Sequence, residues 1–167
     1  MTRKTAVIFV SGGGSNMAAL IEAARVEDYP VEFIAVISDH KQAGGLAKAE
    51  AAGIRTAAFE RRDYGSKAEH EAAILAFLDT LRPDLICLAG YMRLLSAEFI
   101  AAWRGRIINI HPSLLPLFPG LHTHQRALDA GMKVAGCSVH YVTEGVDEGP
   151  VIAQAAVPVV DGDTAVC

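Results

Sequence analysis

Short apolar runs alternate with longer amphipathic stretches from the first residues onward. Five of these runs carry apolar side chains without strict alternation, which is typical of strands buried on both faces of a sheet. They read TAVIFVS (5–11), VEFIAVISD (31–39), IRTAAFE (54–60), DLICLAG (84–90) and RIINI (106–110). Their regular alternation with amphipathic stretches predicts parallel strands joined by helices.

Four stretches between these runs have the 3.6-residue apolar period of helices. They are SNMAALIEAAR (15–25), GGLAKAEAAG (44–53), residues 66–81 and SAEFIAAWRG (96–105). Ser15 or Asn16 is expected to cap the first helix, and the SKAE motif that begins at Ser66 is a capping box for the third. Right-handed crossovers then place helices on both faces of a mostly parallel sheet.

The pattern changes after about residue 132. Two strand-like runs follow, GCSVHYVTE (136–144) and GPVIAQAAVPV (149–159), and the turn GVDEG (145–149) joins them. Runs separated by a short glycine-containing turn predict antiparallel pairing. We therefore expect one α/β domain over residues 1–167, with a Rossmann-like, mostly parallel sheet, helices on both faces and an antiparallel C-terminal strand pair.

Composition narrows the classes of function. The 167 residues are 51% hydrophobic and carry a net charge of −4 without a run of Lys or Arg, which argues against a nucleic-acid partner. The apolar run from Ala6 to Val10 is too short for a signal peptide, and no apolar segment reaches the roughly 18 residues of a membrane span. Cys87, Cys137 and Cys167 are widely spaced, which suits reduced thiols. We expect a soluble, cytoplasmic protein without a membrane partner.

The first strand leads into the first helix through SGGGSN (11–16). Glycines let backbone N–H groups approach an anion, and the start of a helix adds partial positive charge. A dinucleotide site would use Asp39 after the second strand, but the GxGxxG spacing fails because Met17 stands at the third glycine position. The loop with Ser15 and Asn16 is better suited to a single phosphate monoester. A tight turn without a ligand is the alternative.

The stretch NIHPSLLPLFPGLHTH (109–124) holds three histidines and three prolines. Asn109 and His111 lie at the end of a predicted strand, and alternation places their side chains on the same face. An amide that stabilises an oxyanion beside an imidazole that moves a proton forms a catalytic pair, while core packing of His111 is the alternative. Zinc bound by His111, His122 and His124 is disfavoured because HExxH and paired CxxC motifs are absent. Packing or helix capping accounts better for His122 and His124.

Asp147 is the last candidate, in the turn between the final two strand runs. A carboxylate in a glycine-flanked turn is usually a solvated residue. If this turn projects toward the strand ends, Asp147 stabilises the protonated form of His111. The residues alone leave open whether Asp147 reaches His111.

Together these segments resemble the phosphoribosylglycinamide formyltransferase family, the folate-dependent glycinamide ribonucleotide transformylases of purine synthesis. The resemblance covers essentially the whole chain and implies the formyltransferase fold. It rests on the motifs SGGGSN, LAGYMRLLS, NIHPSLLPLFPGLHTHQRAL, GCSVHYVTEGVDEGPVIAQ and VPV, in the order and spacing of the family. Related formyl-group enzymes share Asn-x-His and the later Asp but are not expected to carry FPGLHTH.

The resemblance implies a reaction without a metal and a catalytic trio, Asn109, His111 and Asp147. We expect the three side chains to converge within about one bridging water of each other. The amine of glycinamide ribonucleotide would attack the formyl carbon of 10-formyltetrahydrofolate, the cosubstrate. Asn109 and protonated His111 would stabilise the oxyanion of the tetrahedral intermediate. His111 would also take part in proton transfer to the leaving N10, with Asp147 sustaining its charge. His122 is implied as a support of the loop, and His140 would lie beside the site or pack beneath it.

The resemblance also implies two binding segments. Gly14, Ser15 and Asn16 match the family positions that hold the nucleotide phosphate. Folate contacts are implied for Lys67, Met92, Arg93, Leu94, Leu95, Asn109, Glu144 and Asp147. The partners would be these small molecules alone, and the chain would act as a monomer or homodimer.

Two features depart from the family pattern. Lys67 stands where many members have Arg near the folate carboxylates, which keeps the charge but loses the bidentate fork. The sequence stops at DGDTAVC, where the family continues through a helix that contacts the nucleotide, so a protein ending there would turn over poorly. The alternative functions are formyltetrahydrofolate hydrolysis, in which water replaces the amine, and a non-catalytic folate- or nucleotide-binding module. A nicotinamide-dependent dehydrogenase is a weaker fourth alternative.

Overall fold

The computed structural model describes residues 2–166, so the prediction for Cys167 lies outside the described residues. The chain divides into two compact units, Met1–Ile107 and Ile108–Cys167. The prediction of one domain over the whole chain stays a prediction. Within residues 2–166, no helix combines the length and the apolar composition that crossing a membrane requires.

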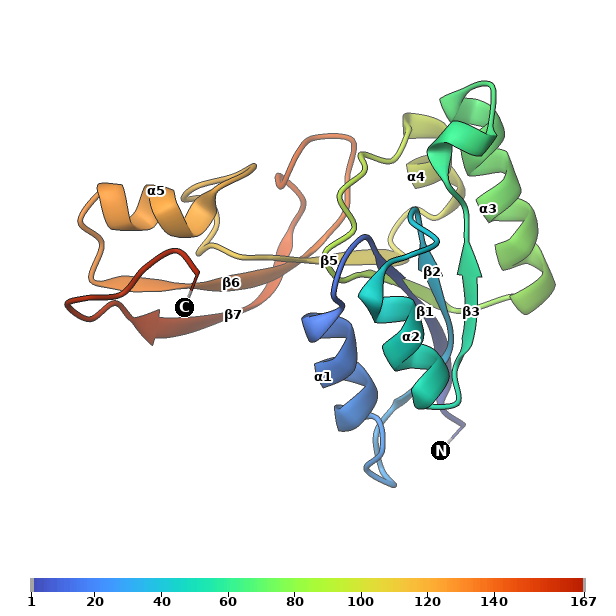
Figure 1. Ribbon diagram of the computed structural model, residues 1–167, viewed down its shortest axis with the longest axis horizontal. Coiled ribbons are helices and arrows are strands. Elements are labelled where there is room, and N and C mark those ends of the chain that lie inside the picture. The colour runs from blue at the N-terminus through green and yellow to red at the C-terminus, as the bar shows by residue number, and fades with distance from the viewer. Residues whose placement is uncertain (1, 167) are drawn as a thin grey trace. The chain divides into compact units, whose positions relative to one another are not determined.

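The first unit is built on parallel strands, as the apolar runs predict. These are β1 (Lys4–Val10), β2 (Val31–Ser38), β3 (Arg55–Ala58) and β4 (Leu85–Leu88). β1 pairs in parallel with β2 and β4, and β2 pairs in parallel with β3, which gives the order β3-β2-β1-β4 (Figure 1). The central strand is fully buried from Ala6 to Val10, which explains its unbroken apolar sequence.

Helices connect these strands in the expected alternation. They are α1 (Ser15–Ala23), α2 (Gly44–Ala51), the short 3-10 helix η1 (Arg61–Asp63), α3 (Lys67–Leu81) and α4 (Ala97–Ala102). The chain moves outward from β1 to β3 through α1 and α2, which lie side by side (Figure 1). It then returns through α3 to β4, on the other side of β1. Because right-handed crossovers that run in opposite directions across a sheet lie on opposite faces, α1 and α2 cover one face and α3 covers the other.

The ends of two helices test the predicted caps. Ser66 caps α3 as expected, because its hydroxyl accepts a hydrogen bond from the Glu69 N–H at 3.1 Å. The prediction that Ser15 or Asn16 caps α1 is wrong. The cap is Gly14, whose φ of +68° turns the chain into the helix without a side-chain hydrogen bond. Both polar side chains are thereby left exposed at the beginning of the helix.

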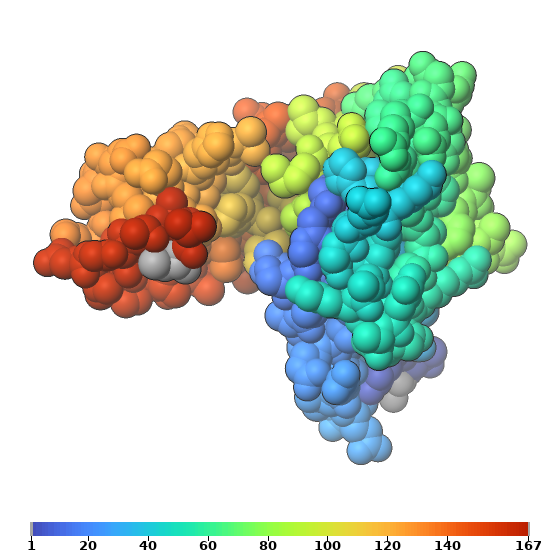
Figure 2. All heavy atoms as spheres, viewed as in Figure 1, coloured from blue at the N-terminus to red at the C-terminus, as the bar shows by residue number. Residues whose placement is uncertain are grey.

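The second unit is antiparallel, as the change of pattern predicts. It contains β5 (Ile107–His111), which begins at the boundary between the units, α5 (Thr123–Asp129), β6 (Val134–Tyr141) and β7 (Val151–Pro158). β6 pairs in antiparallel fashion with both β5 and β7. β7 is exposed along its whole length, and Figure 2 shows its atoms on the molecular surface. The fold class is therefore the predicted one, a parallel α/β arrangement followed by antiparallel strands.

Candidate active site

Strand β5 places Asn109 and His111 two residues apart, so both side chains lie on one face of the strand. The antiparallel register sets Asn109 opposite His140 of β6. His140 Nδ1 lies 2.9 Å from the Tyr141 carbonyl, which can only accept, so Nδ1 carries the proton. The unprotonated Nε2 then accepts from the Asn109 amide at 3.2 Å, which fixes the orientation of that amide.

Asp147 lies in the turn after β6 and joins the same group of side chains. Its Oδ2 is 3.3 Å from His111 Nδ1 and accepts a hydrogen bond from the Gly120 N–H at 2.8 Å. Its Oδ1 is 3.7 Å from His140 Nε2. The structure therefore brings Asn109, His111 and Asp147 together, with His140 between the amide and the carboxylate. All four side chains belong to the second unit.

The ring of His111 is 5% exposed and has acceptors on both sides. One is the Asp147 carboxylate, and the other is the Phe118 carbonyl, 3.0 Å from Nε2. A neutral imidazole has one N–H and can donate to only one of them, whereas the imidazolium donates to both. The imidazolium form of His111 would satisfy both acceptors, and in that form the residue is an acid that can deliver a proton.

A buried polar network holds the loop between β5 and α5. Ser138, which pairs with His111 across the strands, donates to the Ser113 carbonyl at 2.7 Å and accepts from the Leu115 N–H at 3.0 Å. Gln154 donates to the Leu115 carbonyl at 2.9 Å. Sequence reasoning missed Ser138 and Gln154. The signal for Ser138 is its place two residues before His140 on the same strand, which puts both on one face.

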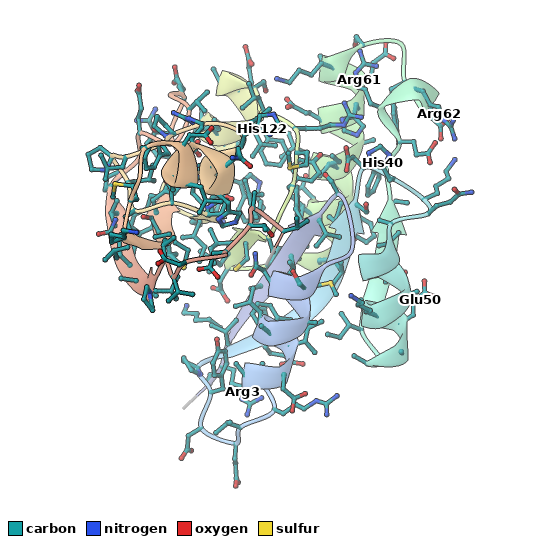
Figure 3. The ribbon with its side chains drawn as sticks, turned by 60° about the vertical axis from the view of Figure 1, so that its left-hand side comes forward. Arg3, His40, Glu50, Arg61, Arg62 and His122 are labelled. Atoms are coloured by element: carbon teal, nitrogen blue, oxygen red, sulfur yellow. The ribbon has the colours of Figure 1, made fainter. Side chains whose placement is uncertain are left out.

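The other two histidines of the loop do not join this group. His122 is exposed and precedes α5 (Figure 3), in the left-handed conformation with a φ of +57° and without a side-chain cap. His124 lines a small cavity of about 10 Å³, room for about one water, beside Pro112 and Met132. Among residues 2–166, no three His, Cys, Asp or Glu side chains are grouped as metal ligands.

The glycine-rich turn in the first unit has the features of an anion site. The first N–H groups of α1 have no intrahelical partners, and no acidic residue lies in its first turn. A Cβ at Gly12 or Gly13 would meet nothing within 4 Å, so the loop is open on that side. Lys48 of α2 donates to the Gly13 carbonyl at 2.6 Å, which adds a positive charge beside the loop.

The segment Met92–Leu95 follows β4 and is tied to the same turn. The Met92 N–H donates to the Ser11 hydroxyl at 2.8 Å. Met92 and Leu94 have exposed fractions of 66% and 68%, which leaves two apolar side chains available for contact with a ring. Lys67 is half-exposed on α3, with its Nζ 3.9 Å from Glu71 Oε1. Glu144 is exposed in the turn after β6 of the second unit.

Asp39 is not available for a nucleotide ribose. Its carboxylate is 2% exposed and lies 2.6 Å from Arg93 Nε in an ion pair. This pairing removes the acidic residue on which the dinucleotide interpretation depends.

Comparison with known proteins agrees with the fold. The profile of the formyl transferase family matches residues 4–166. The solved structure of phosphoribosylglycinamide formyltransferase from Brucella melitensis has a TM-score of 0.95 and 71% identity, and the match covers 98% of this chain and 84% of that chain. The enzyme of the same name from Escherichia coli K12 is 44% identical over 158 residues, 95% of this chain and 74% of that protein.

A third relative is much longer. The trifunctional purine biosynthetic protein adenosine-3 of Drosophila pseudoobscura pseudoobscura is 48% identical over 163 residues, which are 96% of this chain and 12% of that protein. The chain thus spans about an eighth of the length of this relative. The chain belongs to the formyl transferase family.

Proposed function

We propose that the chain transfers a formyl group from 10-formyltetrahydrofolate to the amine of glycinamide ribonucleotide, a step of purine synthesis. Support comes from the names of its relatives, two of which are phosphoribosylglycinamide formyltransferases matched over most of their length. The single observation that carries the proposal is the contact of His111 with Asp147 beside Asn109. This set supplies an acid, a counter-charge and an oxyanion donor.

In the proposed reaction the substrate amine attacks the formyl carbon, and the carbonyl oxygen becomes an oxyanion. The Asn109 amide donates to this oxygen, and protonated His111 adds positive charge beside it. The C–N10 bond then breaks as N10 gains a proton from His111, and the proton that the former amine loses returns to His111 directly or through water. The Nε2 proton of His111 is held by the Phe118 carbonyl, so N10 receives it through a water or after replacing that carbonyl.

We assign the binding of the two substrates to the first unit and to the turn of Asp147. The nucleotide phosphate binds the N–H groups of Gly14, Ser15 and Asn16 at the start of α1. The folate contacts are Lys67, Met92, Arg93, Leu94, Leu95, Asn109, Glu144 and Asp147. His140 orients Asn109. The proposal includes a cytoplasmic location, a monomer or homodimer as the active form, and no metal.

The test is the identity of the labelled product. The chain is incubated with 10-[¹³C]formyltetrahydrofolate, with and without glycinamide ribonucleotide, and products are identified by mass spectrometry. We expect [¹³C]formylglycinamide ribonucleotide, formed only when both substrates are present. Labelled formate at the same rate without the nucleotide would instead identify a hydrolase. Binding of folate with neither product would identify a binding module.

A further inference from the structure

The loops that follow β1 and β4 leave the parallel strands at the same edge. The two strands are neighbours, and the hydrogen bonding between them continues past their ends, because the Ser11 N–H donates to the Gly90 carbonyl at 3.1 Å. In sheets of this kind ligands bind beyond the carboxyl ends of the strands. The glycine-rich turn and the segment Met92–Leu95 therefore begin side by side, and both belong to the first unit.

Ser11 makes a second contact with the chain after β4 through its side chain. Its hydroxyl accepts a hydrogen bond from the Met92 N–H at 2.8 Å. Met92 is the first residue of the segment to which we assign the folate. Gly14, three positions after Ser11, is the first of the residues to which we assign the nucleotide phosphate. One serine thus stands between the two proposed substrate sites.

The turn between Ser11 and α1 is held by α2 through its carbonyls alone. The Gly45 N–H donates to the Gly12 carbonyl at 3.0 Å, and the Lys48 ammonium donates to the Gly13 carbonyl at 2.6 Å. Gly12 and Gly13 are exposed, and glycine loses more backbone freedom on ordering than any other residue. An anion bound to the N–H groups at the start of α1 therefore orders a turn that begins at Ser11.

Ordering one part of a flexible segment lowers the entropic cost of ordering a part that is joined to it. We propose that Ser11 is a positioning residue that couples the two substrate sites, so that the nucleotide at the turn raises the affinity of the Met92–Leu95 segment for the folate. By linkage, the folate raises the affinity for the nucleotide by the same factor. The inference rests on the proposed function and adds to it the dependence of each substrate on the other.

The test measures the binding of tetrahydrofolate, which lacks the formyl group and so cannot react. Its affinity for the intact chain is determined by calorimetry with and without saturating glycinamide ribonucleotide. We expect the nucleotide to tighten this binding about fivefold, equivalent to about 1 kcal/mol. In Ser11→Ala the ratio of the two affinities falls to near one. A uniform change in the folate site cancels in this ratio, so the ratio separates coupling from general damage.

The matched control is Thr5→Val, because Thr5 makes the equivalent contact at the opposite ends of the same strands. Its hydroxyl accepts from the Asp84 N–H at 3.3 Å, immediately before β4. This variant should keep the fivefold ratio, and Ser11→Thr, which retains a hydroxyl, should keep most of it. If Ser11→Ala fails to fold, Ser11→Cys serves, because a thiol is a weak acceptor and should lower the ratio below about twofold.

A second measurement needs no folate. Hydrogen exchange of the Met92 amide is followed by nuclear magnetic resonance with and without glycinamide ribonucleotide. We expect the nucleotide to slow this exchange about fivefold in the wild type and in Thr5→Val, and to leave it unchanged in Ser11→Ala. Because the folate is not present, direct contact between the two substrates cannot produce this result.

The contrary outcomes are distinguishable. Independent binding of the two ligands to the wild type, a ratio that survives Ser11→Ala, or a Met92 amide that does not respond to the nucleotide refutes the coupling and leaves the proposed function intact. Loss of the ratio in Thr5→Val as well shows a general loosening of the strands, which also refutes the role of Ser11. Binding of neither ligand refutes the proposed function, and the coupling with it.

Discussion

At the scale of single residues, the backbone of Asp147 determines what its carboxylate can reach. Its φ of +54° lies in the left-handed region, where Asp and Asn are tolerated better than most residues. In this conformation one carboxylate oxygen contacts both His111 and the Gly120 N–H. The negative charge thus lies against the imidazolium form of His111, which it stabilises.

Asp147→Asn tests that charge directly. Asparagine can adopt the same backbone conformation, and its side-chain carbonyl can still accept from the Gly120 N–H. The neutral amide does not stabilise the imidazolium form of His111. We expect kcat for formyl transfer to fall by about 10²-fold with little change in thermal stability, since general acid catalysis contributes about 10²–10⁴-fold. Asp129→Asn, a surface aspartate that accepts from Gln125, is the control and should keep kcat. Equal rates in the wild type and Asp147→Asn would remove Asp147 from the mechanism.

Cys87 provides a residue-scale prediction about reactivity. It is 6% exposed in β4, and burial raises the pKa of its thiol to about 11 from 9.0. Because the thiolate is the nucleophile, Cys87 is almost entirely unreactive at pH 8 in the folded chain. We expect iodoacetamide to label Cys137, which is partly exposed, faster than Cys87, with the difference lost in urea. Peptide mass spectrometry reads both rates, and equal labelling of the folded chain would contradict this burial.

The sequence pattern placed Asn109 and His111 on one face because side chains in a strand alternate between its two faces. The same pattern could not identify the residues that contact these two side chains. Asp147 reaches His111 across 36 positions of sequence, and the Asn109–His140 contact depends on the register between β5 and β6. The Asp39–Arg93 ion pair spans 54 positions of sequence, and a local pattern could not predict it because it depends on tertiary structure. All of these contacts depend on the tertiary structure. The position of its turn raised the contact of Asp147 with His111 as a possibility, and the family resemblance turned it into an expectation.

At the scale of elements, the start of α1 depends on close contact with the start of α2. The Gly45 N–H donates to the Gly12 carbonyl at 3.0 Å, and a Cβ on Gly14 would lie 2.9 Å from the Gly45 Cα. Gly14 also has a φ of +68°. Two separate constraints therefore require glycine at the turn where we place the nucleotide phosphate.

Gly14→Ala and Gly105→Ala separate these constraints. Gly105 has a similar φ of +71° but open space where a Cβ would lie, so its variant costs only the left-handed strain of about 1–2 kcal/mol. Gly14→Ala adds a backbone clash, so we expect a larger loss of unfolding free energy in urea titrations. It should also raise KM for the nucleotide, which Gly105→Ala should not. Equal destabilisation by both variants would show that α2 moves aside freely.

The elements themselves were the most predictable part of the fold. Apolar runs and helical periods are local, and burial of β1 from Ala6 to Val10 explains why its sequence lacks alternation. The cap of α1 was mispredicted because Ser15 and Asn16 have the composition of caps, while the backbone turns one residue earlier, at Gly14. A glycine with positive φ takes the place of a side-chain cap there. The preference of Ser and Asn for cap positions does not show that the helix begins in this way.

At the scale of the whole molecule, the proposed roles divide between the two units. Asn109, His111 and Asp147 belong to the antiparallel second unit. The glycine-rich turn and the segment assigned to folate belong to the parallel first unit. The proton-transfer residues and the proposed phosphate-binding turn are therefore encoded in different stretches of the chain, whereas the proposed folate contacts come from both. Variants of the turn should change KM for the nucleotide, and variants of the proton-transfer residues should change kcat.

The central claim is that His111 is the acid of a formyl transfer. The most direct measurement is kcat for formylglycinamide ribonucleotide formation by His111→Ala, beside the wild type and with thermal unfolding as the check on folding. We predict that kcat falls by about 10²–10⁴-fold while KM for both substrates changes little, because His111 acts on the developing charge and the proton. A folded His111→Ala chain that forms this product at the wild-type rate would contradict the account.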